Sequence, residues 1–224
     1  MCADFSRYSV IVPALNEAAG IVACLRALAP LRAGGGELIV VDGGSADGTK
    51  AVATPWADKV IDAPRGRATQ MNAGAAMAGG EVLCFVHADT QMSPDAMVQL
   101  ARVQSWGRFD VSFSGRIRGL RMVAWMMNKR SCLTGVVTGD QCLFIPRALF
   151  KEIGGFPVQP LMEDVEISKR LRRHSRPRCL PGPVITDSRR WASRGIWPTI
   201  VLMWFMRLAY FLGAKPERLA QWYR

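Results

Sequence analysis

The chain has 224 residues, of which 50% are hydrophobic, so it is long enough to build one sizeable core. Its 29 basic and 18 acidic residues give a formal net charge of +11, which favours anionic partners such as nucleotides, nucleic acid or lipid head groups. This composition excludes an intrinsically disordered tail and a collagen-like chain.

The cysteines argue against both a disulfide framework and a zinc ribbon, because they are scattered and form no CxxC pair. They stand at Cys2, Cys24, Cys84, Cys132, Cys142 and Cys179. The first seven residues contain no basic run before an apolar stretch, so they do not resemble a signal peptide. From both features we expect a protein of the reducing cytoplasm.

The charge is unevenly distributed along the chain. Residues 1–100 contain 7 basic and 10 acidic residues, whereas residues 101–224 contain 22 and 8. No low-complexity linker and no internal repeat separates the two parts. We therefore expect one domain over residues 1–195, divided at about residue 100 into an acidic half and a basic half, with an apolar, aromatic helical segment over 196–224.

The first half alternates short apolar strands with helices. Strands are predicted at residues 8–12, 38–41, 59–61 and 81–86. Helical spacing begins at Glu17, with Asn16 as the N-cap, and a second helix is predicted over 66–78. Strands that alternate with helices in this way predict a parallel α/β sheet.

The second half is less regular. Strands are predicted at 110–114 and 141–145, and helices at 146–153 and 163–173. Residues 196–212 are strongly apolar, but Pro198 and Arg207 interrupt them and they fall short of the roughly 20 residues that a membrane span needs. Two alternatives stay open for this segment: peripheral contact with an anionic membrane, or packing on the core.

Polar residues follow the strands of the first half at the points where ligands of open α/β sheets bind. Asn16 and Glu17 follow the first strand, Asp42 the second and Asp89 the fourth. Each alone is an ordinary turn residue, but loops from one sheet edge converge on one crevice. A carboxylate at the position of Asp42 is suited to accept hydrogen bonds from a ribose hydroxyl or a base N–H.

Asp89 ends the most apolar strand, where an unpartnered carboxylate is costly, and a divalent cation such as Mg²⁺ or Mn²⁺ would neutralise it. His87 is either a second ligand or a loop residue. The loop over residues 42–49 lacks a P-loop lysine, and no GxGxxG follows a strand, so neither of those phosphate-binding modes is expected.

In the predicted helix 163–173, Asp164 shares an inward face with Ser168 and Leu171, while Glu166 lies about 200° away and should face solvent. An inward carboxylate at this point is either a general base or a structural charge at a helix N-terminus.

Four motifs together resemble family 2 glycosyltransferases, which have the GT-A fold. They are the strand and loop at 9–17, the loop at 40–49, the triplet His87-Ala88-Asp89 in the place of a DxD motif, and Met162-Glu163-Asp164 in the place of an ED motif. The segments 66–74, 139–141 and 188–191 are similar to one subgroup, the radical SAM/selenodomain-associated transferases.

The resemblance implies a Rossmann-like, mostly parallel central sheet flanked by helices, with residues 1–100 binding the nucleotide and 101–195 serving the acceptor and catalysis. It implies transfer of a sugar from a UDP- or GDP-sugar to an unknown acceptor hydroxyl, with inversion, a divalent cation and Asp164 as general base beside Glu163. No nucleic acid is expected as a partner. The alternatives are a nucleotidyltransferase-like enzyme that would release pyrophosphate, and a basic nucleic-acid-binding module.

Carried over to this sequence, the resemblance implies a metal site at Asp89 and His87. It implies that the nucleotide sugar contacts Pro13, Asn16, Glu17, Asp42, Ser45, Asp47, Arg67, Gln70, Asn72, Asp140, Arg190 and Trp191. The departing diphosphate needs cationic stabilisation, for which Arg67 and Arg190 are the candidates. Because His87 replaces the first carboxylate of the DxD motif, a two-carboxylate grip on the metal is absent from that motif.

Overall fold

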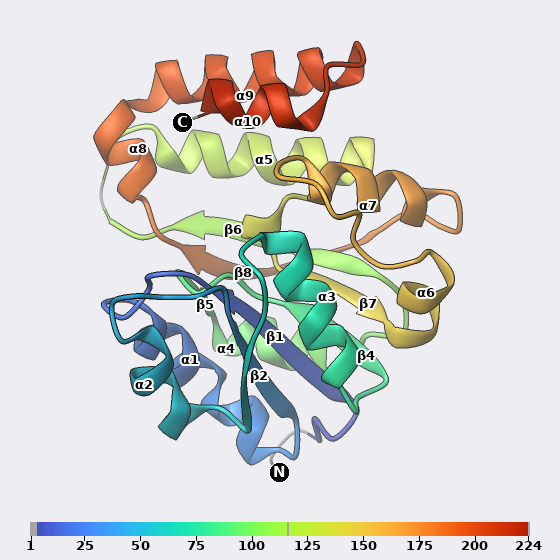
Figure 1. Cartoon of the computed structure of the whole chain (residues 1–224). Coiled ribbons are helices and arrows are strands. Elements are labelled where there is room, and N and C mark those ends of the chain that lie inside the picture. The colour runs from blue at the N-terminus through green and yellow to red at the C-terminus, as the bar shows by residue number, and fades with distance from the viewer. Residues whose placement is uncertain (1–3, 116, 224) are drawn as a thin grey trace.

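The computed structural model describes residues 4–115 and 117–223, except for the side chain of Arg190. Within them, one sheet has the strand order β3-β2-β1-β4-β7-β6-β8-β5 (Figure 1). Its strands are β1 (Tyr8–Ala14), β2 (Glu37–Asp42), β3 (Lys59–Asp62), β4 (Val82–Phe85), β5 (Thr90–Met92), β6 (Gly107–Phe113), β7 (Leu143–Pro146) and β8 (Arg178–Thr186).

The sheet is parallel in its first half and mixed in its second. Strands β3, β2, β1 and β4 are all parallel, whereas β7 is antiparallel to both β4 and β6, and β5 is antiparallel to β8. β6 and β8 are again parallel. The predicted parallel α/β sheet is confirmed for residues 8–86, and the complete sheet is a mixed one.

Helices connect and cover these strands. They are α1 (Ile21–Ala33), α2 (Thr49–Ala53), α3 (Arg67–Met77), α4 (Pro94–Leu100), α5 (Leu120–Thr134), α6 (Arg147–Glu152), α7 (Glu163–Arg172), α8 (Arg189–Arg194), α9 (Ile196–Phe211) and α10 (Pro216–Tyr223), with 3₁₀ turns η1 (Thr54–Trp56) and η2 (Gly139–Gln141).

The core lies on both faces of the sheet, because side chains alternate along each strand. Val10 and Val12 of β1 pack with the apolar faces of α1 and α4, while Ile11 packs on the other face with α3, α6 and α7. Gly74 lets α3 approach β1 closely, since a Cβ there would lie 2.4 Å from Ile11 Cγ2. The sheet is therefore covered by helices on both sides.

The start of the first helix differs from the prediction. α1 begins at Ile21 after Gly20, not at Glu17, so Asn16 is not its N-cap. Asn16 instead has φ 55°, a left-handed conformation that asparagine tolerates better than most residues. The chain between β1 and α1 is thus a longer loop than the helical spacing suggested, and this loop borders the site described below.

Helices α9 and α10 form an outer layer above α5 (Figure 1). Met206 and Leu219 are buried in a small apolar cluster with Met162, which joins this layer to the start of α7. The opposite face of α9 is exposed at Trp197 and Phe211. Among the described residues, no helix is both long and apolar enough to cross a bilayer.

The described residues contain one disulfide, although the scattered cysteines argued against a disulfide framework. Cys132 of α5 and Cys179 of β8 are joined by a disulfide, 47 residues apart in sequence. Cys24, Cys84 and Cys142 are buried free thiols. Spacing in the sequence could not reveal the pair, because α5 and β8 become neighbours only through β6, which lies beside both.

Candidate active site

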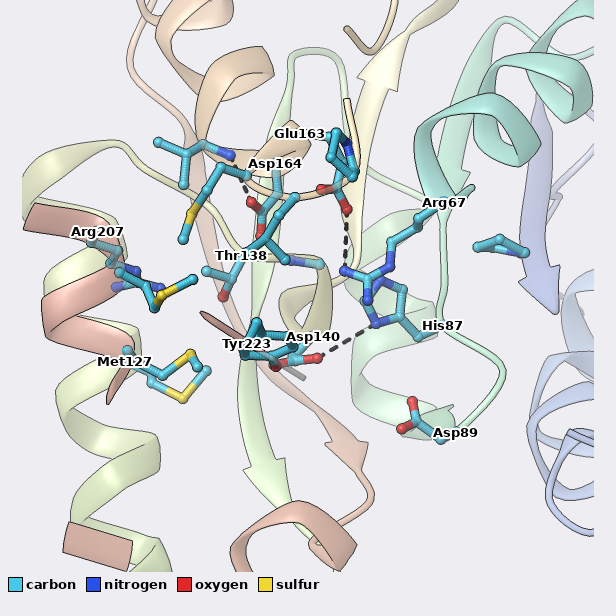
Figure 2. Close-up of a pocket in the computed structure, with 18 of the residues that line it drawn as sticks. Arg67, His87, Asp89, Met127, Thr138, Asp140, Glu163, Asp164, Arg207 and Tyr223 are labelled. Carbon is cyan, nitrogen blue, oxygen red and sulfur yellow. Dashed lines mark hydrogen bonds and ion pairs between the residues drawn. The ribbon is translucent and has the colours of Figure 1, made fainter. Parts of the chain in front are cut away.

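A pocket of about 730 Å³ lies where the loops that follow β1 and β4 meet α3, α5, α7 and α9. Its walls carry carboxylates, arginines and the imidazole of His87, and on the α5 and α9 side they carry methionines together with two further arginines. The carboxyl ends of the strands are the usual ligand-binding edge of such sheets. Figure 2 shows the labelled side chains converging on this space.

Asp164 enters the pocket from the first turn of α7. Its carboxylate accepts hydrogen bonds from the amides of Gly139, at 3.2 Å, and Val165, at 2.8 Å. The inward face predicted for it is confirmed by Ser168, which is buried and donates to the backbone carbonyl of Asp164. Glu166 does not simply face solvent, because it accepts a hydrogen bond from the hydroxyl of Tyr210 on α9.

Glu163 is buried beside Asp164 and accepts a hydrogen bond from Arg67 Nη1 at 3.1 Å (Figure 2). Burial raises the pKa of the Glu163 carboxyl, the neighbouring charge of Asp164 raises it further, and Arg67 opposes both. This ion pair holds the guanidinium of Arg67 at the pocket wall, and 44% of the Arg67 side chain is exposed.

His87 is held against the turn η2. Its Nδ1 lies 3.5 Å from Asp140 Oδ1, and a Cβ added at Gly139 would lie 2.4 Å from its Nε2. Both ring nitrogens therefore face η2. In Figure 2 the ring turns toward Asp140, and Asp89 lies apart from this contact. This arrangement favours a positioning contact between His87 and Asp140 over ligation beside Asp89.

Asp89 and Glu17 are the carboxylates that the loops after β4 and β1 bring to the pocket. Asp89 lines the pocket and accepts a hydrogen bond only from its neighbour Thr90, at 3.3 Å, among the described residues. Burial, and then the negative charge of Asp89, raises the pKa of Glu17. Within the described chain, no group of three or more His, Cys, Asp or Glu side chains could hold a metal ion. Glu17 Oε2 also lies 3.6 Å from Arg189 Nη2, so Asp89 is the main carboxylate for a Mg²⁺-like ion that takes phosphate oxygens from a substrate, with Glu17 next to it.

The loops that follow β1 and β2 are joined by their own polar side chains. The backbone N–H of Asn16 donates to Ser45 Oγ at 2.9 Å, and the side-chain oxygen Oδ1 of Asn16 accepts from the backbone N–H of Ala46. Asp47 Oδ2 accepts from the amide of Ala18 at 3.0 Å. These side chains stabilise the rim of the crevice, and they do not line the pocket.

Gln70 and Asn72, two residues predicted to bind the nucleotide sugar, stabilise the fold by hydrogen bonds to backbone groups. Gln70 is buried, and its Nε2 donates to the carbonyls of Ala14 and Val41 at 2.8 Å each, which joins the ends of β1 and β2. Asn72 exchanges two hydrogen bonds with the backbone of Phe156, at 2.8 and 2.9 Å. Gln70 still lines the pocket, whereas Asn72 does not.

Asp42 is buried at the end of β2. Its Oδ2 accepts hydrogen bonds from the amides of Gly44 and Ser45, at 3.0 and 2.9 Å, and so shapes the following loop. Its Oδ1 is buried without a partner among the described residues. Asp42 lies outside the pocket that contains Asp89 and Asp164.

The predicted site residues therefore fall into two groups. The pocket is lined by Pro13, Glu17, Arg67, Gln70, His87, Asp89, Asp140, Glu163, Asp164 and Trp191. Asn16, Asp42, Ser45, Asp47 and Asn72 support its border from outside. The side chain of Arg190 lies outside the described part of the chain.

Two pocket residues, Arg130 and Arg207, were not predicted. Arg130 comes from α5 and Arg207 from α9, and both line the wall beyond Asp164. Arg207 stands alone within an apolar stretch, and that isolation is the signal that could have identified it. Arg130 lies in a helix that the sequence did not predict.

Comparison with known proteins decides the family. Residues 9–151 match the family described as Glycosyl transferase family 2. The chain belongs to glycosyl transferase family 2. The matched segment runs from β1 to α6 and contains the strand-end loops that form one side of the pocket.

A relative in Mycobacterium bovis, named as a PGL/p-HBAD biosynthesis glycosyltransferase, is 36% identical over 102 residues. The match covers 42% of this chain and 40% of the relative, so it spans about two-fifths of the length of each protein.

Solved structures of family-like fold align over most of the chain. A mannosyltransferase from Pyrobaculum calidifontis, in complex with GDP-Man and Mn²⁺, has 25% identity and a TM-score of 0.59, covering 81% of this chain and 56% of its own. TarS of S. aureus, in complex with UDP-GlcNAc, has 19% identity and a TM-score of 0.65, covering 81% and 58%. The second likeness concerns the fold alone, and together they agree with the expected GT-A architecture.

Proposed function

We propose that this family 2 protein transfers a sugar from a nucleoside diphosphate sugar to an acceptor hydroxyl. The observation that carries the proposal is the presence of Asp89 and Asp164 on the walls of one pocket at the carboxyl ends of the strands. Complexes of structural neighbours with GDP-Man and with UDP-GlcNAc support a UDP- or GDP-sugar as donor.

In this proposal, the donor diphosphate lies at the Asp89 end of the pocket. Asp89, with Glu17 beside it, would hold a divalent cation, either Mg²⁺ or Mn²⁺, and the Mn²⁺ in the mannosyltransferase complex supports this choice of group. When bound, such an ion supplies positive charge next to the departing diphosphate. Arg67 adds a guanidinium from the neighbouring wall.

Asp164 is proposed as the general base. Its carboxylate takes the proton of the acceptor hydroxyl while that oxygen forms a bond to the anomeric carbon, and the bond from that carbon to the diphosphate oxygen breaks. A single displacement from the face opposite the leaving group inverts the anomeric configuration. The hydrogen bond from the Gly139 amide fixes the orientation of this carboxylate.

The test is release of UDP or GDP from a panel of sugar nucleotides with Mn²⁺ or Mg²⁺, with water as the acceptor. We expect Asp89→Asn and Asp164→Asn each to lower the rate by about 10²-fold or more. Asp95→Asn, an exposed carboxylate on α4, is the matched control. Release at the wild-type rate in both site variants would exclude the assignment.

We also propose that the outer face of α9 contacts an anionic membrane surface. Five large apolar side chains on this face are more than half exposed: Trp197, Val201, Trp204, Leu208 and Phe211. Exposed cations at Arg194, Lys215 and Arg218 lie near the two ends of the helix. An apolar face with flanking cations is typical of helices that lie in a lipid interface.

The cytoplasmic location expected from the sequence stays a prediction. So does membership of the radical SAM/selenodomain-associated subgroup.

A further inference from the structure

The pocket has a second charged end, away from Asp89. Figure 2 shows Arg207 on one side of Asp164 and Thr138, and Asp89 on the other side. Arg130 lines the same cavity from α5. Two arginines in addition to Arg65 and Arg67 thus line one pocket, and the donor diphosphate proposed above does not account for them.

These two arginines lack compensating ion pairs within the described residues. Arg130 Nη1 donates to the carbonyl of Val136 at 3.1 Å, but its Nη2 is buried without a hydrogen-bond partner in the described chain. No described carboxylate lies within ion-pair distance of Arg207 or of Arg130. A buried guanidinium nitrogen without an acceptor is costly, so an acceptor from a ligand is the natural complement.

The two charges also act on each other. Burial, and then the positive charge of Arg207, lowers the pKa of Arg130 to about 9, against the attraction of Asp164. Burial lowers the pKa of Arg207 as well, against the attraction of Asp164. Like charges that are brought together out of water attract an oxyanion strongly, because the low dielectric strengthens the contact.

The wall next to these arginines is apolar. Met127 of α5 and Ile200, Met203 and Met206 of α9 line the same part of the cavity. Methionine side chains adapt to apolar groups of varied shape. A ligand that fits this end therefore has an oxyanion next to an apolar portion.

We propose that Arg130 and Arg207 bind a phosphate or carboxylate group on an amphiphilic acceptor, and so place the acceptor hydroxyl near Asp164. This inference rests on the proposed function, because it names the class of acceptor for the same reaction. The anion reaches the arginines either on a free small acceptor or on a lipid-like one, and the apolar wall favours the second.

The experiment is isothermal titration calorimetry of the full chain with octyl phosphate, inorganic phosphate and octanol, in the presence and absence of UDP, GDP and Mn²⁺. We expect octyl phosphate to bind at least about tenfold more tightly than octanol, because only the phosphate can pair with the arginines. Weaker binding of inorganic phosphate than of octyl phosphate would support the amphiphilic acceptor, and equal binding would contradict it.

Arg130→Gln and Arg207→Gln are each expected to weaken octyl phosphate binding by about tenfold or more, while the affinity for UDP or GDP with Mn²⁺ stays the same. Arg121→Gln, an exposed arginine on α5 that does not line the pocket, is the matched control. Thermal unfolding of each variant checks that it folds, and Arg207→Lys should retain part of the binding because it keeps the charge.

Two further results would overturn the proposal: unchanged octyl phosphate binding in both folded glutamine variants, or competition in which UDP or GDP displaces octyl phosphate. The second would assign the arginines to the donor. Failure of wild-type protein to bind UDP or GDP would instead contradict the proposed function, and octyl phosphate binding would still report on the arginine pair.

Discussion

Arg67 and Glu163 join two edges of the pocket that are 96 residues apart in sequence. Arg67 is the first residue of α3 and Glu163 the first residue of α7, and the guanidinium donates to the carboxylate across 3.1 Å. The contact fixes the start of α7, and with it Asp164, relative to the sheet. It therefore links the stability of the fold to the geometry of the site.

Loss of this contact should destabilise the protein measurably. Arg67→Gln leaves the buried Glu163 carboxylate without its cation, and we expect a loss of about 1–3 kcal/mol in the free energy of unfolding, reduced from the fully buried case because Arg67 is partly exposed. Urea unfolding measures it. Arg65→Gln, an exposed neighbour, is the control, and a double variant that also carries Glu163→Gln should recover part of the loss. Additive losses would contradict the coupling.

The stability should depend on pH through Glu163. Its folded pKa is raised above the ordinary value of 4.5, so the folded state holds this proton more tightly, and the stabilisation present below pH 4.5 is lost as pH rises through the raised value. The unfolding free energy of the wild type minus that of Glu163→Gln should therefore increase as pH falls from 7 toward 4.5. A constant difference would be inconsistent with the buried carboxyl.

The contribution of Asp47 to the free energy of unfolding should change with pH in the opposite direction to that of Glu163. Hydrogen bonds from the Thr49 hydroxyl and the Ala18 amide lower its pKa below the ordinary value of 3.8, so its contribution is present above pH 3.8 and is lost as pH falls through the lowered value. The unfolding free energy of the wild type minus that of Asp47→Asn should thus decrease only below about pH 4.

Removal of the cation should affect Asp89 variants and wild type differently. We expect EDTA to abolish release of the nucleoside diphosphate from the wild type, and added Mn²⁺ to restore it. For Asp89→Asn, the Mn²⁺ concentration that gives half-maximal rate should rise about tenfold or more, because one of the two carboxylates near the ion is neutral. The His87→Gln variant should need the wild-type Mn²⁺ concentration, since its ring faces Asp140 and Gly139. A raised Mn²⁺ requirement in His87→Gln would make the histidine a ligand.

The sequence predicted the half of the site that depends on local pattern. Buried apolar runs identify β1, β2 and β4, and Asn16, Glu17, Asp42 and Asp89 were expected to meet where these strands end. Glu17 and Asp89 line the pocket, whereas Asn16 and Asp42 do not. The hydrogen-bond partners could not be predicted. Asn16 and Ser45 bond to each other's loops, an outcome that depends on the left-handed backbone at Asn16 and on the register of two strands.

The structure of residues 101–224 was harder to predict from the sequence, because many of its contacts join residues far apart in the chain. β8 contains Pro181 and Pro183, which interrupt a strand pattern, and its pairing with β5 joins Thr90 to Thr186. α5 mixes basic and apolar residues without a clear period, so neither the helix nor Arg130 could be predicted. Glu166 was expected in solvent, because nothing in its own helix reveals that Tyr210 of α9 covers it.

Gln70 should matter for the fold whatever its part in ligand binding. Gln70→Ala leaves the buried carbonyls of Ala14 and Val41 without their shared donor, and the expected loss is about 1–3 kcal/mol in the free energy of unfolding. Gln91→Ala, an exposed glutamine on β5, is the control in urea unfolding. Nucleotide affinity lost without any loss of stability would show that Gln70 acts on the ligand and not on the strand ends.

The outer face of α9 gives a prediction that is independent of catalysis. Trp197 and Phe211 are 69% and 80% exposed, and burying two aromatic side chains in a lipid interface contributes several kcal/mol at most. The double variant Trp197→Ser/Phe211→Ser should therefore bind vesicles of phosphatidylglycerol and phosphatidylcholine about tenfold or more weakly in a flotation assay. Val158→Ser, at a side chain that is 78% exposed in the loop before α7, should bind like the wild type.

Because the cations at the ends of α9 add an electrostatic attraction, vesicles of phosphatidylcholine alone should bind less wild-type protein than the anionic vesicles do. If the double variant floats as well as the wild type on the anionic vesicles, α9 does not contact the membrane, and its apolar face serves another purpose.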